Sequence, residues 1–127
     1  MNPIATVAAV IIKDNKILLA QRNKKTFHGY WCLPGGHIDQ GENAITAIKR
    51  EVKEETNLEM RNIKFLFYRD EIFHDLKWYA VCLVFRGEAE GTIKFNKTEI
   101  KDVRWFPLEE AKKMKLAFDH QEILNRI

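Results

Sequence analysis

The chain has 127 residues, a length suited to one domain with a single core. Its 46% hydrophobic and 31% charged residues form an ordinary globular mixture, and no apolar run is long enough to span a bilayer. The formal net charge of +3 is compatible with anionic substrates, but it is too small to indicate a nucleic-acid-binding surface.

The first residues lack the charged region and the cleavage site of a signal peptide. Cys32 and Cys82 lie within apolar, strand-like runs, and neither belongs to a Cys-x-x-Cys pair. We therefore expect two buried free thiols and a cytoplasmic location, where thiols stay reduced.

A hairpin is predicted at the beginning of the chain. Residues 5–12 are rich in β-branched side chains and indicate a buried strand, Asp14 and Asn15 form a tight turn, and residues 16–21 return as a second strand. Arg22 follows at the start of a basic loop. It is either a surface cation or a phosphate contact at the mouth of a cleft.

An aromatic segment, residues 27–33, leads into Pro34, Gly35 and Gly36. Glycines at this place suit a turn that needs positive φ, or a backbone that approaches a ligand closely. Residues 37–38 are expected to continue as a short strand.

Residues 43–57 are predicted to form a helix. Asn43 is a good N-cap, and Asn57 is the best non-glycine residue for the left-handed position that closes a helix. At about 100° per residue, Ile45, Ile48 and Val52 form one apolar stripe that should face a core.

Three acids share one face of this helix. Glu51, Glu54 and Glu55 lie at i, i+3 and i+4, so their carboxylates should converge beside the apolar stripe. Like charges at this spacing repel, and the last turn of a helix favours cations. The face is therefore either a solvated acidic surface in which Arg50 pairs with Glu54, or a site for a hard divalent cation such as Mg²⁺. Glu42, just before the helix, is expected to cap or orient it.

The second half of the chain alternates strands and loops. Strands are predicted at residues 63–68, 76–85 and 103–106, separated by a polar connection (69–75), an acidic loop (87–91) and an irregular segment (92–102). Helices are predicted at residues 107–115 and 120–126, and Asp119 forms a capping box with Glu122 at the second of these. No repeat or linker interrupts the sequence, so we predict one domain over residues 1–127.

The stretch of residues 36–58 resembles the Nudix box, G-x5-E-x7-R-E-U-x-E-E-x-G-U, in which U is a bulky apolar residue. The matching residues are Gly36, Glu42, Arg50, Glu51, Val52, Glu54, Glu55 and Leu58. Asn57 stands where the family has glycine. Because Asn tolerates a left-handed conformation, we expect a mild loss of stability and an intact site. The flanking strands fit the family over nearly the whole chain.

The resemblance implies an α+β fold, an α-β-α sandwich whose mixed central β-sheet lies between helices. It also implies hydrolysis of a nucleoside diphosphate linked to another group, X, by attack of water on phosphorus, with Mg²⁺ or alternatively Mn²⁺ as cofactor. The carbonyl of Gly35 and the side chains of Glu51, Glu54 and Glu55 would bind the metal, and Arg50 would hold the acids in place.

Further roles follow from the same resemblance. Either Glu54 or Glu99 would be the base that deprotonates the attacking water. Arg22 and Gly36 would contact the substrate, and Asp119 would read a purine base in addition to capping a helix.

Residues outside the box are expected to select X. We favour a (d)NTP or an oxidised purine (d)NTP, cleaved to the monophosphate and pyrophosphate, because Glu99 and Asp119 are present and the signatures of the NADH-cleaving and coenzyme A branches are absent. ADP-ribose or a nucleotide sugar is the alternative, since L-A-F-D-H at residues 116–120 also occurs in chains assigned to ADP-ribose cleavage.

A hypothesis of another class is a non-catalytic module that senses a nucleotide. Retention of Glu51, Glu54 and Glu55 argues against it. The expected partner is a small-molecule nucleotide, with neither a membrane nor a nucleic acid. A homodimer is compatible with the aromatic side chains between Phe73 and Tyr79.

Overall fold

The computed structural model describes residues 2–127 as a set of strands with a few helices between and after them. The strands are β1 (Ile4–Lys13), β2 (Lys16–Arg22), β3 (Trp31–Cys32), β4 (Gly35–His37), β5 (Glu59–Phe73), β6 (Trp78–Glu90) and β7 (Ile100–Pro107). The helices are α1 (Ala44–Thr56), α2 (Leu108–Ala111) and α3 (Gln121–Leu124), with short 3-10 turns at η1 (His74–Leu76) and η2 (Ala117–Asp119).

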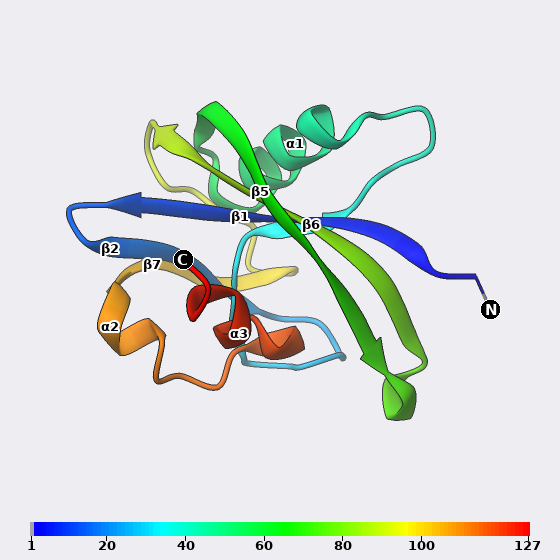
Figure 1. The fold of residues 1–127 in the computed structure, drawn as a ribbon. Coiled ribbons are helices and arrows are strands. Elements are labelled where there is room, and N and C mark those ends of the chain that lie inside the picture. The colour runs from blue at the N-terminus through cyan, green and yellow to red at the C-terminus, as the bar shows by residue number, and fades with distance from the viewer. Residues whose placement is uncertain (1) are drawn as a thin grey trace.

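One mixed sheet forms the centre of the molecule. The strands follow the order β3-β2-β1-β6-β5, while β4 pairs with β1 and β7 pairs with β2. β1 and β6 run parallel, whereas the other paired strands run antiparallel. Figure 1 shows α1 on one side of the sheet and the C-terminal helices α2 and α3 on the other. The predicted α-β-α sandwich with a mixed sheet is confirmed.

Side-chain alternation along the central strands explains the two layers. Successive side chains of a strand point to opposite faces. Val7 and Ala9 of β1 accordingly belong to the core that α1 closes, whereas Ala8 and Val10 belong to the core that α2 and α3 close. The β-branched and small residues of β1 are apolar in both positions because both faces of this strand are covered.

The predicted caps of α1 are both present. The Asn43 side chain accepts a hydrogen bond from the backbone N–H of Thr46 at 2.8 Å, and Asn57 closes the helix in the left-handed region with φ 69°. The Asn57 side chain also donates to the carbonyl of Thr92 at 3.0 Å. The helix that carries the acids is therefore fixed at each end by its own sequence.

The predicted apolar stripe of α1 is only partly correct. Ile48 and Val52 are fully buried, but Ile45 is 42% exposed. In the first turn Ala44 packs against the core instead of Ile45, and the buried face continues with Ala47 and Ile48.

β5 and β6 form one long hairpin, so two predicted loops are wrong. Residues 69–73 belong to β5 and residues 87–90 belong to β6, where Glu88 and Glu90 are exposed and alternate with half-buried Gly87 and Ala89. Arg61 pairs with Glu90 across the hairpin at 3.5 Å. The charged residues occupy the solvent face of a strand, a pattern with the period of two that strands follow.

The C-terminal segment contains less helix than predicted. α2 ends at Ala111, and α3 begins only after His120, without a side-chain cap. The capping box is wrong because Asp119 adopts a left-handed conformation, with φ 53°, and Glu122 instead pairs with Arg69 at 2.9 Å. The segment is therefore attached to β5 through side chains.

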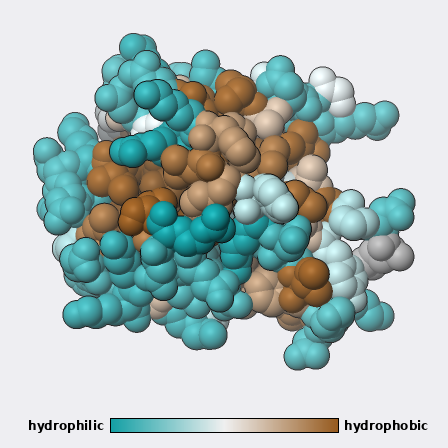
Figure 2. Space-filling model, in the orientation of Figure 1, coloured by the Kyte–Doolittle hydropathy of each residue, from teal (hydrophilic) through white to brown (hydrophobic). Residues whose placement is uncertain are grey.

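Exposed hydrophobic residues gather on β5. Phe65, Tyr68 and Ile72 are each more than half exposed, and Figure 2 shows hydrophobic residues across the middle of the face on which Figure 1 shows β5. The homodimer remains a prediction. Among residues 2–127 there is no helix with the length and apolar character that a membrane crossing requires.

The C-cap of α1 gives a first prediction. Asn57→Ala should lower the free energy of unfolding by about 1–2 kcal/mol, because Ala disfavours the left-handed region and cannot bond to Thr92. Asn57→Gly should lie within about 1 kcal/mol of the parent, because the gain in backbone freedom offsets the lost hydrogen bond. Urea unfolding would measure both, and equal effects of the two variants would contradict the capping role.

Candidate active site

A cavity of about 450 Å³ lies between the carboxyl end of α1, strand β4 and the C-terminal segment. Its wall combines carboxylates, basic side chains and aromatic rings, and we call the part lined by the buried residues Thr6, Glu71, Cys82, Phe118 and His120 its buried end. The lining residues are Thr6, Val7, Arg22, Lys24, Cys32, Leu33, Gly35, Gly36, His37, Asp39, Glu51, Glu55, Glu71, Trp78, Cys82, Phe118 and His120. A volume of this size accommodates a nucleotide-sized ligand.

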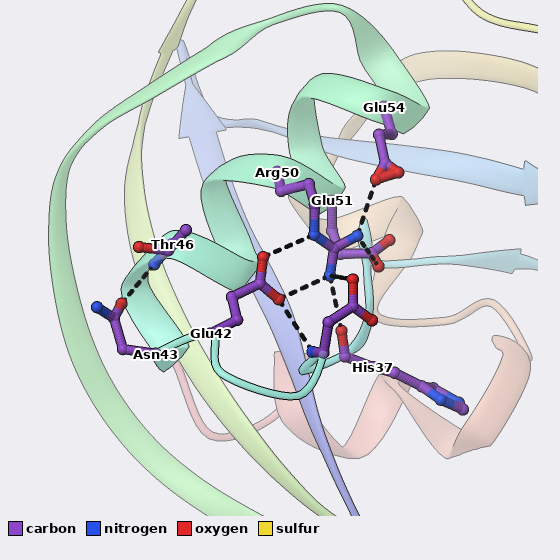
Figure 3. Close-up of polar contacts among 8 residues, drawn as sticks. His37, Glu42, Asn43, Thr46, Arg50, Glu51 and Glu54 are labelled. Atoms are coloured by element: carbon purple, nitrogen blue, oxygen red, sulfur yellow. Dashed lines mark hydrogen bonds and ion pairs between the residues drawn. The ribbon is translucent and has the colours of Figure 1, made fainter.

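Arg50 lies at the centre of an ionic network beside the cavity (Figure 3). Its Nε and Nη2 donate to the two carboxylate oxygens of Glu42 at 2.8 and 2.9 Å. Its Nη1 donates to Glu51 at 2.9 Å and to Glu54 at 2.8 Å. Nη2 also donates to the carbonyl of His37 at 2.9 Å. One guanidinium thus ties the segment before the helix to two acids of the helix.

The network perturbs the acid–base behaviour of its members. Hydrogen bonds from Arg50 lower the pKa of Glu42 to about 2, and the same bonds raise the pKa of Arg50 above its ordinary value. Glu42 also accepts from the backbone N–H of Asp39 at 3.0 Å. Glu42 therefore orients the segment that enters α1, as expected, while Asn43 provides the cap.

Glu51 and Glu55 are the two helix acids that line the cavity. Burial raises the pKa of Glu55 to about 8, and the backbone N–H of Gly35, which donates to it at 2.9 Å, counteracts part of that shift. Burial also raises the pKa of Glu51, opposed by Arg50. Two carboxylates with incomplete charge compensation lie in one cleft, and such perturbed groups are typical of functional sites.

Glycine is required at positions 35 and 36 because neighbouring atoms approach the backbone too closely for a side chain. A Cβ at Gly35 would lie 2.0 Å from the carbonyl oxygen of Val7, and one at Gly36 would lie 2.7 Å from the carboxylate of Glu51. Neither residue has positive φ, so a turn of that type is wrong: both belong to β4, which pairs with β1. The absence of side chains brings the β4 backbone against the acids.

The residues of this cleft fit a hard divalent cation. Glu51, Glu55 and the backbone carbonyl groups of β4 offer oxygen donors only, which is the donor type that Mg²⁺ takes, together with water and phosphate. Within residues 2–127, however, no three His, Cys, Asp or Glu side chains are already grouped as a metal-binding cluster. The predicted convergence of three carboxylates is therefore incomplete, because Glu54 points to Arg50 and is 52% exposed.

Basic side chains border the same cavity. Arg22 and Lys24 line it, and both exert a favourable charge interaction on the Glu55 carboxylate. The Arg22 guanidinium lies 4.9 Å from the centre of the Phe118 ring and donates from Nε to the carbonyl of Thr26 at 2.8 Å. Cations beside a pair of carboxylates suit a ligand that carries phosphate groups together with a metal.

Four predicted site residues lie outside the cavity wall: Arg50 and Glu54 belong to the ionic network beside it, and Glu99 and Asp119 lie on other segments. Glu99 is exposed, but its carbonyl accepts from the backbone N–H of Asn23 at 3.0 Å, so its segment lies beside the residue that follows Arg22. Asp119 is half-buried, 3.8 Å from Lys115 and 3.4 Å from Gln121. The role of Glu99 as the general base and the role of Asp119 as the reader of the purine stay predictions.

Sequence reasoning missed the buried end of the cavity. Glu71, only 3% exposed, accepts from Trp78 Nε1 at 3.1 Å and from Arg69 at 3.1 Å, and it lies 3.5 Å from His120 Nε2. Thr6 is 4% exposed and lines the same end. The alternation of residues 69–73 was the available signal, because it places Arg69, Glu71 and Phe73 on one strand face. The two cysteines are buried and free, as predicted.

The raised pKa of Glu55 predicts a pH-dependent stability. The folded state holds the proton up to pH about 8, whereas the unfolded state releases it near pH 4.5. The folded state therefore binds more protons in this window, and the free energy of unfolding should decrease as pH rises from 4.5 to 8. Denaturant unfolding without metal should show this slope, and Glu55→Gln should reduce it. Parallel pH profiles of the two proteins would exclude the raised pKa.

The chain was compared with known proteins. The Nudix-domain family model matches residues 2–127. An ADP-ribose pyrophosphatase of Methanocaldococcus jannaschii is 34% identical over 124 residues, which are 98% of this chain and 72% of that protein. The NAD-capped RNA hydrolase NudC of Vibrio atlanticus is 33% identical over 101 residues, which are 79% of this chain. The match spans only 36% of the length of the Vibrio protein.

Solved structures give the same result. The Nudix domain of Shewanella oneidensis NrtR in complex with ADP-ribose superposes with a TM-score of 0.86 at 28% identity, covering 99% of this chain and 86% of that one. A MutT Nudix hydrolase from Burkholderia pseudomallei has a TM-score of 0.82 at 27% identity and covers 86% of each chain. With the family match over nearly its whole length and the acids of the box lining or bordering one cleft, the chain belongs to the Nudix family and is a Nudix pyrophosphohydrolase.

Proposed function

We propose that this protein hydrolyses a nucleoside diphosphate linked to a second group, with ADP-ribose as the first candidate substrate and Mg²⁺ as the cofactor. One observation carries the proposal: the buried carboxylates of Glu51 and Glu55 share a cavity with the basic side chains of Arg22 and Lys24. A diphosphate with a bound cation meets both kinds of group in such a cavity.

The chain's own residues have distinct tasks in this proposal. Glu51 and Glu55 would hold the cation, with a β4 carbonyl such as that of Gly35 beside them. Arg50 would keep Glu51 oriented through its bond at 2.9 Å, a supporting contact of the kind that tunes metal sites. Arg22 and Gly36 would contact the diphosphate from the rim and from the β4 backbone.

The reaction itself needs one water and one base. The water oxygen forms a new bond to phosphorus, the bridging P–O bond breaks, and the proton of the water passes to a carboxylate. When bound, Mg²⁺ neutralises phosphate charge and lowers the pKa of a coordinated water. Glu54, which is bonded to Arg50, is the candidate for the general base from the helix, and Glu99 is the candidate from the loop beside Asn23.

ADP-ribose comes before a triphosphate for two reasons. The Methanocaldococcus relative is named as an ADP-ribose pyrophosphatase, and the Shewanella domain was solved with ADP-ribose. In addition, the triphosphate prediction depended on Glu99 and Asp119, and neither is among the residues that line the cavity. ADP-ribose would give AMP and ribose phosphate.

A (d)NTP, including an oxidised purine (d)NTP, remains the second candidate. It is supported by the position of the Glu99 segment, which is bonded to Asn23 next to the cavity residue Arg22, and by the likeness to a MutT structure. A product assay with Mg²⁺ separates the candidates. Pyrophosphate from a triphosphate identifies this class, whereas AMP from ADP-ribose identifies the first. Nucleotide binding without turnover of either would contradict both and indicate a sensor.

The buried acid should be essential in that assay. Glu55→Gln is expected to lower kcat by about 10²–10³, because it removes a strong electrostatic contributor at the reacting phosphate. Lys49→Arg, a change on the exposed side of the same helix, is the matched control and should retain parent activity. If Glu55→Gln stayed within a few-fold of the control, Glu55 could not hold the cation.

Two substitutions that keep the shape of the side chain but remove its acidic group test which residue is the general base. Glu54→Gln and Glu99→Gln should be compared at saturating Mg²⁺ over a range of pH. The exchange of the true base should lower kcat by about 10²-fold or more and remove the acidic limb of the pH profile. Unchanged kcat in both variants would place the base elsewhere.

A further inference from the structure

We propose that the buried end of the cavity binds the nucleobase, and that Thr6 and Glu71 together select a purine that carries an amino group. This inference rests on the proposed function, because it assumes that the ligand is a nucleotide. It assigns the selection of the nucleobase to Thr6 of β1 and Glu71 of β5 instead of to Asp119.

Thr6 supplies an unused polar group. Its hydroxyl is the only buried side-chain nitrogen or oxygen without a hydrogen-bond partner among the described residues, and Thr6 is 4% exposed. Cys82 lies opposite it in the β1–β6 register. Burial raises the pKa of that thiol to about 12, a weak contact with Thr6 counteracts part of this shift, and the neutral sulfur is a poor hydrogen-bond partner. A buried hydroxyl without an oxygen or nitrogen partner is unfavourable by itself. A ligand group in this cavity would satisfy it.

Glu71 supplies an acceptor in the wall of the same cavity, on β5, which β6 separates from β1. One of its carboxylate oxygens is bonded to Arg69 and lies near His120, while the other, Oε1, accepts from Trp78 Nε1 at 3.1 Å and from no other group within residues 2–127. A carboxylate oxygen has two lone-pair directions, so Oε1 can accept one more bond. Arg69 compensates the charge, which suits a neutral ligand with an N–H donor.

His120 fixes the donor pattern around Glu71. Its Nδ1 accepts from the backbone N–H of Leu33 at 3.1 Å, so in the neutral ring the proton is on Nε2, which faces Glu71. Every neighbouring group thus donates toward Glu71. A ligand carbonyl would find no hydrogen-bond donor on Glu71, whereas the N–H of a ligand amino group could donate to Glu71 Oε1.

Aromatic rings complete the wall. Trp78 and Phe118 line the cavity with ring centres 4.9 Å apart, and Arg22 lies over the Phe118 ring. Flat heterocycles bind against such surfaces and are distinguished by hydrogen bonds at their edges. The phosphates of the same ligand would then extend toward Glu51 and Glu55 in the same cavity.

Binding measurements without hydrolysis test the inference. AMP and purine riboside monophosphate, which lacks the amino group, are titrated by calorimetry into the 127-residue protein. The parent should bind AMP about tenfold more tightly or better, since a site built for a donor rejects the analogue that lacks it. Thr6→Val should reduce this preference several-fold with little change in Tm, because the only neighbour of the hydroxyl that could bond to it within the described residues is the weakly bonding Cys82 sulfur. Thr46→Val, on the exposed face of α1, is the matched control.

A second variant reverses the hydrogen-bond pattern. Glu71→Gln introduces an amide that can donate, so the preference should shift from AMP toward IMP, whose six-position carries an oxygen. If this variant fails to fold because Arg69 loses its partner, Thr6→Val still decides. Equal binding of AMP and the analogue by the parent would overturn the inference, as would a Thr6→Val protein that matches the Thr46→Val control.

Hydrolysis measured on the same preparations separates the two proposals. Turnover of a nucleotide, together with equal binding of AMP and purine riboside monophosphate, contradicts only the assignment of the nucleobase site. An amino preference sensitive to Thr6→Val without any turnover supports the base assignment and contradicts the proposed reaction. Absence of both binding and turnover overturns both.

Discussion

The guanidinium of Arg50 is the contact on which the rest of the site depends. It bonds Glu42, Glu51, Glu54 and the carbonyl of His37, so one side chain joins the strand before the helix to the helix itself. Like carboxylates on one helix face repel each other, and the last turn of a helix favours cations. Arg50 offsets this repulsion for the outer acids. It forms no bond to Glu55, whose charge is compensated only by the more distant Arg22 and Lys24.

The sheet explains why such an acid can exist in the fold. Gly35 donates its N–H to Glu55 at 2.9 Å, and the neighbouring strands β1 and β4 approach so closely that no side chain fits at Gly35. The two cores above and below β1 hold these backbones in place. A poorly compensated carboxylate that costs stability is a common feature of sites that bind cations, since the bound ion supplies the missing charge.

Local chemistry made much of this site predictable. The caps Asn43 and Asn57 and the spacing of the helix acids are short-range signals, and they locate α1 correctly. The alternation in β5 could indicate a strand, but it could not indicate the partner of Glu71, because His120 is far away in the sequence and meets Glu71 only when the C-terminal segment packs against β5. The charged residues at 69–71 led to the prediction of a loop, because charge in the sequence does not show that one face of a strand is buried and the other exposed. The role of Glu54 is likewise unresolved by spacing, because Arg50 competes for its carboxylate.

The raised pKa of Glu55 and its proposed role as a cation ligand together predict that a bound cation displaces its proton, and this exchange can be measured directly. Calorimetric titration of Mg²⁺ near neutral pH, repeated in buffers of different ionisation enthalpy, counts the protons released on binding. With a pKa of about 8 for Glu55, the parent should release close to one proton per bound Mg²⁺, and Glu55→Gln should release far less. Equal proton release by the two proteins, or Mg²⁺ binding by the parent with no proton release, would contradict this account of the site.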